Sequence, residues 1–436
     1  MSPTFTLHES AAALRRHETS TVDLVHQCLA QIDRYEPRVH AWVSIDRDGA
    51  LRQAETCDRE LAAGQDRGPL HGMPLGVKDI IDVADWPTAA GSRRWAQSIA
   101  REDAAVVRNL RAAGAIFLGK TVTTAFASFD PPITRNPWNL ERTPGGSSSG
   151  SAAALATGMC LGALGSQTGG SITRPASYCG VCGMKPTFGT APLAGIVPLA
   201  ASLDHPGPLA RCVRDLRLLL EPIVEFRLFP DALVPEHPLR LGRALGLFER
   251  DADASVRTAM EEILPRLRRQ GIEIVDVTLP ASFEEVGSRH RTVMAVEAAT
   301  WHRERFARHP DDYPPHIRRL IEEGLSIPAT RYAACKIHQQ ELSREMDRVL
   351  GVQEMFLLTP AATSPAPAAD STGNPAFNSP WSYTGLPTVS MPTGQFVAGL
   401  PLAIQLVGPR FEDSKLLAAA ERVEAALAAP TRFPPF

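Results

Sequence analysis

The spacing of apolar residues alternates along the chain between a helical period and short continuous runs. Periodic spacing predicts helices over residues 21–36, a stretch ending at Gly64, 103–113, 253–270, 294–308, 330–350 and 415–427. Short apolar runs predict strands over 41–45, 75–77, 80–83, 115–118, 241–247, 272–277, 355–358, 388–391 and 402–407. Such alternation is typical of helices packed on a sheet, so we expect an α/β fold.

One Pro/Ala/Ser-rich stretch, residues 360–369, has the composition of a linker. Apolar strands resume after it at 388–391 and 402–407, so we interpret it as a loop that crosses the sheet edge. Internal repeats are absent. We therefore expect a single domain over 1–436, with the N-terminal helices within 7–64 packing on its core.

The segment from Thr143 to Ala176 is rich in glycine and serine. Two Gly-Gly-Ser triplets, at 145–147 and 169–171, bracket an Ala-rich stretch. Flexible linkers around a helix would have a similar composition. Two triplets joined by packed Ala and Leu favour a site instead, because bare glycine lets backbone N–H groups approach a substrate and bind an anion. A hydroxyl beside such N–H groups is the arrangement that acyl transfer needs.

The overall composition narrows the function classes. The chain has 436 residues, of which 44% are hydrophobic and 21% charged, with a net charge of -3 and a pI near 6.5. The chain has no excess of basic residues that would indicate binding to nucleic acid. No run approaches the ~18 apolar residues of a membrane span. The first twenty residues lack an apolar leader segment, so we expect a cytoplasmic protein with neither nucleic acid nor membrane as partner.

The chain has only seven cysteines. A small, odd number of cysteines indicates free thiols in a reducing compartment. Cys179 and Cys182 form a C-x-x-C pair, but no second ligand pair or thioredoxin-like context accompanies it. We interpret both as buried thiols and expect no metal.

The lysines are scarce, which makes each one informative. Of 45 basic residues only five are lysine, namely Lys78, Lys120, Lys185, Lys336 and Lys415. An amine can lose its proton where a guanidinium cannot, so each of the five is a candidate base. Lys78 and Asp79 lie between two apolar runs, which predicts that both are buried and partnered.

Two motifs match known catalytic patterns in the wrong context. Residues 114–121 fit the phosphate-loop pattern, but their middle is apolar and would form the strand itself. Residues 146–150 fit the G-x-S-x-G elbow of α/β-hydrolases, yet turn residues rather than a strand precede them. We reject both interpretations.

Several segments together resemble the amidase signature family. They are GVKDIIDV, GAIFLGKT, TPGGSSSGSAAALA, GSQTGGS, RPASYCGVCGMKPTFG, SLDHPGPLARCVRD, TGLPTVSMPTG and GLPLAIQLVGP. The resemblance implies one large domain in which helices cover both faces of a mixed central β-sheet. It also implies a Ser–cis-Ser–Lys triad that cuts amides without a cofactor, with Ser171 as nucleophile, Ser147 as the serine after a cis peptide, and Lys78 as base.

The sequence departs from the family pattern around the second triplet. Gln167 replaces the usual Asp and Thr173 the usual Arg, with Arg174 one place later. This variant is similar to the malonamidase branch, in which an arginine holds a substrate carboxylate. We therefore expect Arg174, Gly146 and Ser148 to contact the substrate. We expect that substrate to be a short carboxylate-bearing amide such as malonamate or a carboxylated urea derivative. The alternative is that Arg174 pairs with a protein carboxylate and the substrates are neutral.

A serine–lysine mechanism makes specific demands on the surroundings of Lys78. The histidine nearest the triplets, His205, lies in a His-Pro-Gly-Pro segment typical of a turn. A lysine base must be neutral, which requires its pKa to fall by roughly two to three units from about 10.4. Burial beside Val77 and Ile80 can supply that shift. Asp79 fits a structural carboxylate better than a catalytic one.

Backbone N–H groups are predicted to form the oxyanion hole, from Thr168, Gly169, Gly170 and Ser171. The expected activity is hydrolysis of the C–N bond of a small-molecule amide through an acyl-enzyme, releasing ammonia or an amine. Two alternatives stay open, an amidotransferase subunit that passes glutamine-derived ammonia to a partner and a non-catalytic binding protein. A homodimer also remains open.

Overall fold

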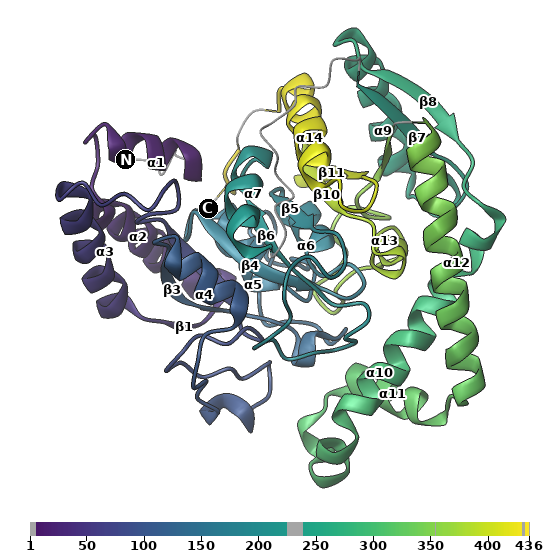
Figure 1. The fold of residues 1–436 in the computed structure, drawn as a ribbon, viewed down its shortest axis with the longest axis horizontal. Coiled ribbons are helices and arrows are strands. Elements are labelled where there is room, and N and C mark those ends of the chain that lie inside the picture. Colours follow the sequence, from purple (N-terminus) through teal and green to yellow (C-terminus); the bar gives the residue numbers. More distant parts are fainter. Residues whose placement is uncertain (1–5, 225–238, 354, 430–431, 436) are drawn as a thin grey trace.

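The computed structural model describes residues 6–224, 239–353, 355–429 and 432–435, and these build one mixed sheet (Figure 1). The strands within the described residues are β1 (Trp42–Ile45), β2 (Pro74–Lys78), β3 (Ile116–Thr121), β4 (Gly162–Gln167), β5 (Cys182–Lys185), β6 (His205–Ala210), β7 (Arg240–Ala244), β8 (Glu273–Val277), β9 (Phe356–Pro360), β10 (Thr388–Val397) and β11 (Leu400–Val407). Their order is β1-β3-β2-β4-β6-β5-β10-β11-β9-β7-β8.

The helices alternate with the strands in the chain. They are α1 (Leu7–Arg15), α2 (Thr21–Val39), α3 (Arg47–Ala62), α4 (Ala105–Ala112), α5 (Ser149–Ala156), α6 (Thr173–Cys179), α7 (Val213–Leu220), α8 (Leu247–Arg250), α9 (Ala254–Arg269), α10 (Val286–Arg308), α11 (Pro315–Ser326), α12 (Ala329–Gln353), α13 (Ser379–Thr384) and α14 (Asp413–Leu427). Helices α10, α11 and α12 lie together at the end of the molecule away from α1–α3 (Figure 1).

Helices cover both faces of the sheet. Neighbouring residues of a strand point to opposite faces, and two residues of β5 show where each helix lies. A Cβ on Gly183 would meet the Ala176 side chain of α6, whereas the Cys182 thiol donates to Glu424 of α14 at 3.5 Å. The predicted single α/β domain, with a mixed central sheet between helical layers, is therefore confirmed.

The strands β2 and β4 position the two Gly-Gly-Ser triplets. They are parallel neighbours, with Leu75 to Val77 in register with Gly162 to Leu164. The carboxyl ends of parallel neighbours meet at one edge of a sheet, so Lys78 at the end of β2 lies close to the segment that follows Gln167 in β4. The first triplet precedes α5, which packs on β2 and β4.

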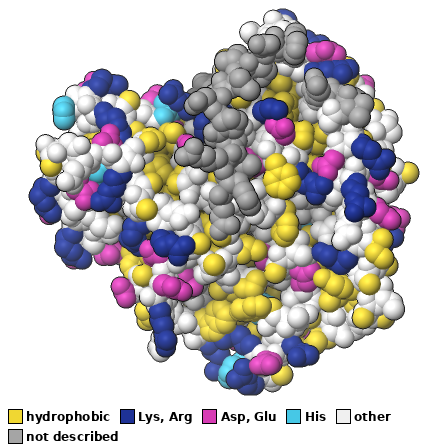
Figure 2. All heavy atoms as spheres, in the orientation of Figure 1, with side chains coloured by type: hydrophobic (Ala, Val, Ile, Leu, Met, Phe, Trp, Pro, Cys, Tyr) yellow, Lys and Arg dark blue, Asp and Glu magenta, His cyan; other side chains and the backbone are white. Residues whose placement is uncertain are grey.

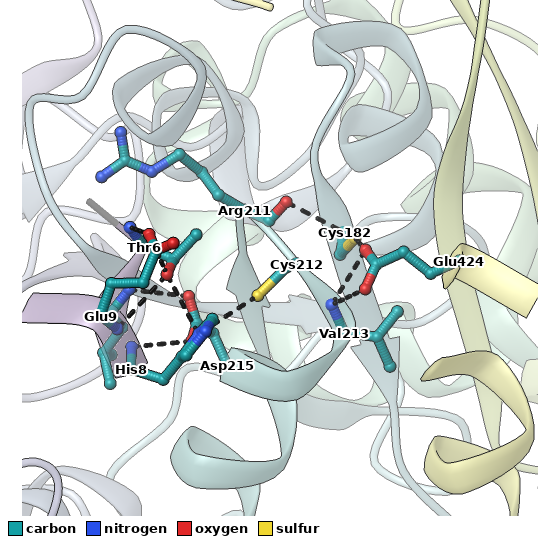
Figure 3. Close-up of polar contacts among 10 residues, drawn as sticks. Thr6, His8, Glu9, Cys182, Arg211, Cys212, Val213, Asp215 and Glu424 are labelled. Atoms are coloured by element: carbon teal, nitrogen blue, oxygen red, sulfur yellow. Dashed lines mark hydrogen bonds and ion pairs between the residues drawn. The ribbon is translucent and has the colours of Figure 1, made fainter. Parts of the chain in front are cut away.

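The N-terminal helix α1 is tied to the sheet region by one buried carboxylate (Figure 3). Asp215 in the first turn of α7 accepts hydrogen bonds from the backbone N–H groups of Leu7 and His8, at 2.8 and 2.9 Å. The His8 ring nitrogen Nδ1 adds a third contact at 2.8 Å. A carboxylate at the first turn of a helix satisfies N–H groups that have no partner within the helix.

The structure corrects three expectations about local structure. Residues 80–83 form turns with a single bridge from Ile81 to Ile196 rather than a strand, because the chain bends away from the sheet after Lys78. The His-Pro-Gly-Pro segment is strand β6, whose ladder with β4 pairs Ser166 with Pro206. The stretch 360–369 does not cross a sheet edge, since β9 before it lies between β11 and β7.

Charges of both signs are mixed on one face of the molecule. On the face drawn in Figure 2, basic and acidic side chains are interspersed. No helix in the described part of the chain is both long and apolar enough to cross a membrane.

Candidate active site

Lys78 is a fully buried lysine whose amine is surrounded by hydroxyls. Its Nζ donates to the Ser147 hydroxyl at 2.7 Å and to the Ser166 hydroxyl at 2.8 Å. No carboxylate among the described residues forms an ion pair with it. Burial therefore holds the pKa of Lys78 well below its usual value, with only a weaker opposing influence from Asp204. The amine is suited to act as a base.

The two Gly-Gly-Ser triplets meet beside this amine. The peptide bond between Gly146 and Ser147 is cis. The backbone N–H of Ser148 donates to the carbonyl of Ser171 at 3.1 Å, which joins the first triplet to the second. The Ser171 hydroxyl forms no hydrogen bond with a described residue, and 8% of Ser171 is exposed. Ser171 is thus the member of the group that is open to an incoming molecule.

The backbone from Thr168 to Ser171 has bonded carbonyls and unbonded N–H groups. Each carbonyl of this run is already bonded: those of Thr168, Gly169, Gly170 and Ser171 accept from His290, the Ser382 hydroxyl, the Arg174 N–H and the Ser148 N–H, respectively. In a trans peptide the N–H points opposite to the carbonyl. The N–H groups of Gly169, Gly170 and Ser171 have no acceptor among the described residues, so they can bind a developing oxyanion.

Gln167 fixes the end of this run. Its side-chain oxygen accepts from the N–H groups of Ile172 and Thr173, each at 3.0 Å, and from the Thr173 hydroxyl at 3.1 Å. Its amide nitrogen donates to the Ser382 hydroxyl at 3.3 Å. Both substitutions relative to the family pattern, Gln167 and Thr173, therefore bond to each other and hold the turn after Ser171.

Thr168 contributes its side chain to the support of the site. Its hydroxyl donates to Asp204, which also accepts the backbone N–H groups of Leu199 and Ala200 at 2.9 and 3.0 Å. Burial raises the pKa of Asp204 to about 6, although these hydrogen bonds oppose it. Asp204 and Ser166 are not predictable from the sequence, since nothing in their local pattern distinguishes them from ordinary polar residues.

Glycine is required by the space at both triplets. Gly145 has a φ of +82°, and a Cβ there would lie 2.8 Å from the Pro175 backbone. A Cβ on Gly146 would lie 2.9 Å from Thr372, and one on Gly170 would lie 2.8 Å from the Asn378 side-chain oxygen. The walls of the site thus approach the backbone too closely for a side chain.

Arg174 lies behind the first triplet with an unusual set of partners. It is 2% exposed, and its Nη2 donates to the Gly146 carbonyl at 2.9 Å. Within the described residues, its Nε and Nη1 have no hydrogen-bond partner and no carboxylate pairs with it. Burial lowers its pKa to about 10. The predicted alternative of a protein carboxylate beside Arg174 therefore has no counterpart in the described residues.

A cleft of about 430 Å³ lies next to residues 168–171, and the side chains of His290 and Ser379 stand between the cleft and Gly169. His290 lies in its wall and bonds through Nε2 to the Thr168 carbonyl at 2.9 Å. Burial lowers the pKa of His290 to about 4, so the ring is neutral at pH 7 and Nε2 carries its proton. Thr372 and Ser379, which contact Gly146 and Gly169, also line this cleft. His290, Thr372 and Ser379 are not predictable as site residues from the sequence, because they come from distant parts of the chain.

The remaining predicted residues take supporting places. The Ser148 hydroxyl is fully buried and donates to the Ser166 carbonyl at 3.2 Å, so only its backbone faces the second triplet. Asp79 forms a buried ion pair with Lys120 at 3.0 Å. Burial raises the pKa of Asp79 even though Lys120 opposes it. Residues 116–121 are strand β3, which leaves no phosphate loop.

Two clusters in the described residues have the composition of metal ligands, and both lie outside this site. They are His8, Cys212 and Asp215, and Cys57, Glu60 and His71. In the first, the Asp215 carboxylate is already used by the start of α1 (Figure 3). Neither cluster includes Lys78 or a residue of the two triplets.

The comparisons with known proteins all indicate the same family. The family model "Amidase" covers residues 23–417. A glutamyl-tRNA(Gln) amidotransferase subunit from Roseiflexus sp. is 33% identical, with 94% of each chain covered. The putative amidase AmiD of Mycobacterium tuberculosis is 32% identical over 98% of this chain and 95% of its own. The peptide amidase structure from Stenotrophomonas maltophilia aligns with a TM-score of 0.87 and 28% identity, covering 99% of both chains. These matches do not single out the malonamidase branch.

Proposed function

The chain belongs to the amidase family, and on this premise we propose that it hydrolyses small amides through an acyl-enzyme formed on Ser171. Lys78 is the base, Ser147 carries protons between Lys78 and Ser171, and the N–H groups of Gly169, Gly170 and Ser171 bind the oxyanion. The observation that carries this proposal is the buried, unpaired Lys78 amine, 2.7 Å from the Ser147 hydroxyl.

Each step conserves protons. The Ser171 oxygen attacks the amide carbon while its proton passes to Ser147 and the Ser147 proton passes to the neutral Lys78 amine. The tetrahedral intermediate then expels the leaving amine, which takes the proton back along the same path. Water attacks the resulting ester by the same relay and frees the acid. One N–H donor in an oxyanion hole typically lowers the barrier by about 2.7 to 4 kcal/mol.

Substitution of the nucleophile tests the proposal. Ser171→Ala should reduce the turnover of a small amide on the order of 10⁶-fold, since loss of a nucleophile removes the covalent route. Ser288→Ala, at an exposed position of α10, is the matched control. Hydroxylamine added to the wild type should trap the acyl group as a hydroxamate. If Ser171→Ala kept more than a few per cent of the activity, another nucleophile would have to act.

A second candidate, the role of an amidotransferase component, is supported by the 33% identity to such a protein from Roseiflexus sp.. In that case ammonia released from glutamine would pass to a partner. Purified chain alone, without ATP or partner, decides between the two. Release of ammonia from several small amides at comparable rates supports a hydrolase, whereas turnover confined to glutamine and dependent on added partner supports the amidotransferase.

The substrate is proposed to carry a carboxylate on a short acyl chain, as in malonamate. The support is the Arg174 guanidinium, which is buried, has two unpartnered nitrogens, and lies against Gly146 and Gly170. A guanidinium binds a carboxylate in bidentate fashion. The branch-like motif around Arg174 suggests the same class of substrate.

The proposal for the substrate has its own test. Arg174→Ala should raise KM for malonamate by roughly 10-fold to 100-fold, the effect of losing a hydrogen bond to a charged group, and should spare a neutral amide of equal length. Circular dichroism and unfolding curves would establish that the variant folds. Equal losses on both substrates would leave Arg174 as a support for the Gly146 carbonyl.

A further inference from the structure

A second cavity lies on the other side of Ser382 from the oxyanion segment. It encloses about 440 Å³, within the range of small-molecule sites. Its wall comes from α12, from the end of α13, and from residues around Phe188 and Phe411. It shares no lining residue with the cleft over His290. It therefore requires an explanation separate from the amide site.

The charged side chains that line this cavity are all basic. Lys336, Arg344 and Arg410 line it, and no aspartate or glutamate is among its lining residues. Two of the three have an acidic neighbour behind the wall. Arg410 pairs with Asp347. The Lys336 amine donates at 2.8 Å to the Ser202 hydroxyl, which in turn donates to Glu297. The Arg344 guanidinium is exposed and has no ion pair or hydrogen bond with a described residue. A concave surface of one charge concentrates ions of the opposite charge.

The face of α12 toward the cavity is polar at helical spacing. Its lining residues are Lys336, Gln339, Gln340, Ser343 and Arg344. Residues three and four apart share one face of a helix, so this stripe covers two turns with hydrogen-bond donors. A polar stripe ordinarily faces solvent, but this one lines a cavity that also contains the partly exposed rings of Phe188 and Phe411, 38% and 59% exposed. The surface combines cations and amide donors with apolar contact area.

We propose that this cavity binds a small organic anion, a carboxylate or phosphate group attached to an apolar or aromatic portion. Arg344 and Lys336 hold the charged group and Phe411 contacts the apolar portion. A ligand here would be adjacent to Ser382, whose hydroxyl donates to the Gly169 carbonyl and accepts from Gln167. The anion site thus lies one side chain away from the oxyanion segment.

Calorimetric titration of the full chain tests the site without any reliance on amidase activity. The probes are benzoate, phenyl phosphate and inorganic phosphate, with benzyl alcohol as the neutral control. Wild type should bind phenyl phosphate or benzoate with a stoichiometry of one, more weakly at high salt, and should not bind benzyl alcohol. Preference between the two aromatic anions identifies whether the charged group is a carboxylate or a phosphate.

Substitutions locate the binding. Arg344→Gln and Lys336→Met should each weaken the preferred aromatic anion at least about 10-fold, the effect of losing a charged hydrogen bond. Phe411→Ser should weaken the aromatic anion and leave inorganic phosphate unchanged. Arg348→Gln, one turn further along α12 and outside the cavity, should change nothing. Absence of saturable binding in the wild type, or equal binding by Arg344→Gln and wild type, would overturn the proposal.

Discussion

Lys78 is fully buried and forms no ion pair with a described carboxylate, a placement that few lysines have. Its lowered pKa makes the neutral amine dominant at a lower pH than in an ordinary lysine. We expect kcat/KM to rise with pH as Lys78 loses its proton and then to reach a plateau. Lys78→Met and Lys78→Arg should both be inactive, since neither side chain can accept a proton at these pH values. An active Lys78→Arg enzyme would contradict the role of base.

Gly170 offers a test of the oxyanion segment that leaves the triad intact. The added methyl of Gly170→Ala would lie 2.8 Å from the Asn378 oxygen and 3.1 Å from Arg174 Nη1, so the peptide must shift. A displacement of the N–H donors should lower kcat by roughly 10-fold to 1000-fold with a smaller change in KM. Gly351→Ala, where a Cβ has open space in α12, is the control. Equal kcat values for the two variants would exclude this oxyanion geometry.

At the level of single residues, the sequence predicted the reactive side chains of the site better than the residues that contact them. The triad candidates and the glycines were recognisable from spacing and from a family resemblance. Ser166, Asp204 and His290 were not, because each acts through contacts across the sheet or from α10 that no local pattern encodes. Arg174 was recognised, but its burial behind Gly146 was not.

At the scale of elements, strand β5 carries a buried amine whose charge the fold compensates only in part, through Asp413. Lys185 is fully buried, and among the described residues its Nζ donates only to the Pro186 carbonyl, at 3.1 Å. Burial lowers its pKa from 10.5 to about 7. Between pH 7 and 10.5 the Lys185 amine is therefore protonated in the unfolded chain and neutral in the native state. Below about pH 7 the buried charge lowers the free energy of unfolding by about 5 kcal/mol, and this penalty disappears as the pH rises from about 7 to 10.5.

Substitution of Lys185 measures this effect. Lys185→Met should unfold at higher denaturant concentration than the wild type at pH 6, and the advantage should shrink toward pH 9. Equilibrium denaturation at several pH values gives the comparison. Lys415→Met, at an exposed lysine of α14, should show no such trend. Parallel pH dependences of wild type and Lys185→Met would show that the Lys185 amine remains protonated in the native state.

The attachment of α1 to α7 depends on hydrogen bonds to the buried carboxylate of Asp215. Asp215→Ala removes the acceptor of three N–H groups and should lower the free energy of unfolding by about 3 kcal/mol, with faster amide exchange in residues 7–15. Asp253→Ala, an exposed helix cap, should lower it by about 1 kcal/mol.

The pH dependence of the free energy of unfolding measures how much the His8 side chain contributes to the attachment of α1. The hydrogen bond to Asp215 raises the pKa of His8 above 6.5, against the effect of burial. Its stabilisation is fully present below pH 6.5 and is lost as the pH rises through the raised value. Asp215→Ala should therefore be more damaging at pH 5.5 than at pH 8. A cost that is independent of pH would mean that the backbone N–H groups alone attach α1.

Strong periodicity predicted most of the long helices and the apolar strands other than 80–83, whereas helices α7 and α11 and the centre of the sheet were missed. Strands β4, β5 and β6 are short and rich in glycine or proline, so propensity indicates turns. Their conformation comes from pairing within the sheet and from the close approach of α5 and α6, which only small residues permit. Local sequence does not contain that information.

In the whole molecule, both halves of the chain build the site. The triad candidates and the oxyanion segment come from residues 78–171, while Thr372, Asn378 and Ser382 come from the last quarter. A truncated chain that ends before β9 would keep the reactive groups and lose one wall of the site. The family match over residues 23–417 agrees with this dependence on nearly the full length.

The position of β5 beside β10 has a consequence for synthesis on the ribosome. β5 is complete at Lys185, but its second neighbour begins at Thr388, about 200 residues later. At 5 to 20 residues per second, β5 is an open edge for about 10 to 40 s. An open strand edge invites pairing with another nascent chain, and a charged side chain on that edge opposes it. We therefore expect Lys185, which weakens the finished fold, to oppose such pairing while the chain is unfinished.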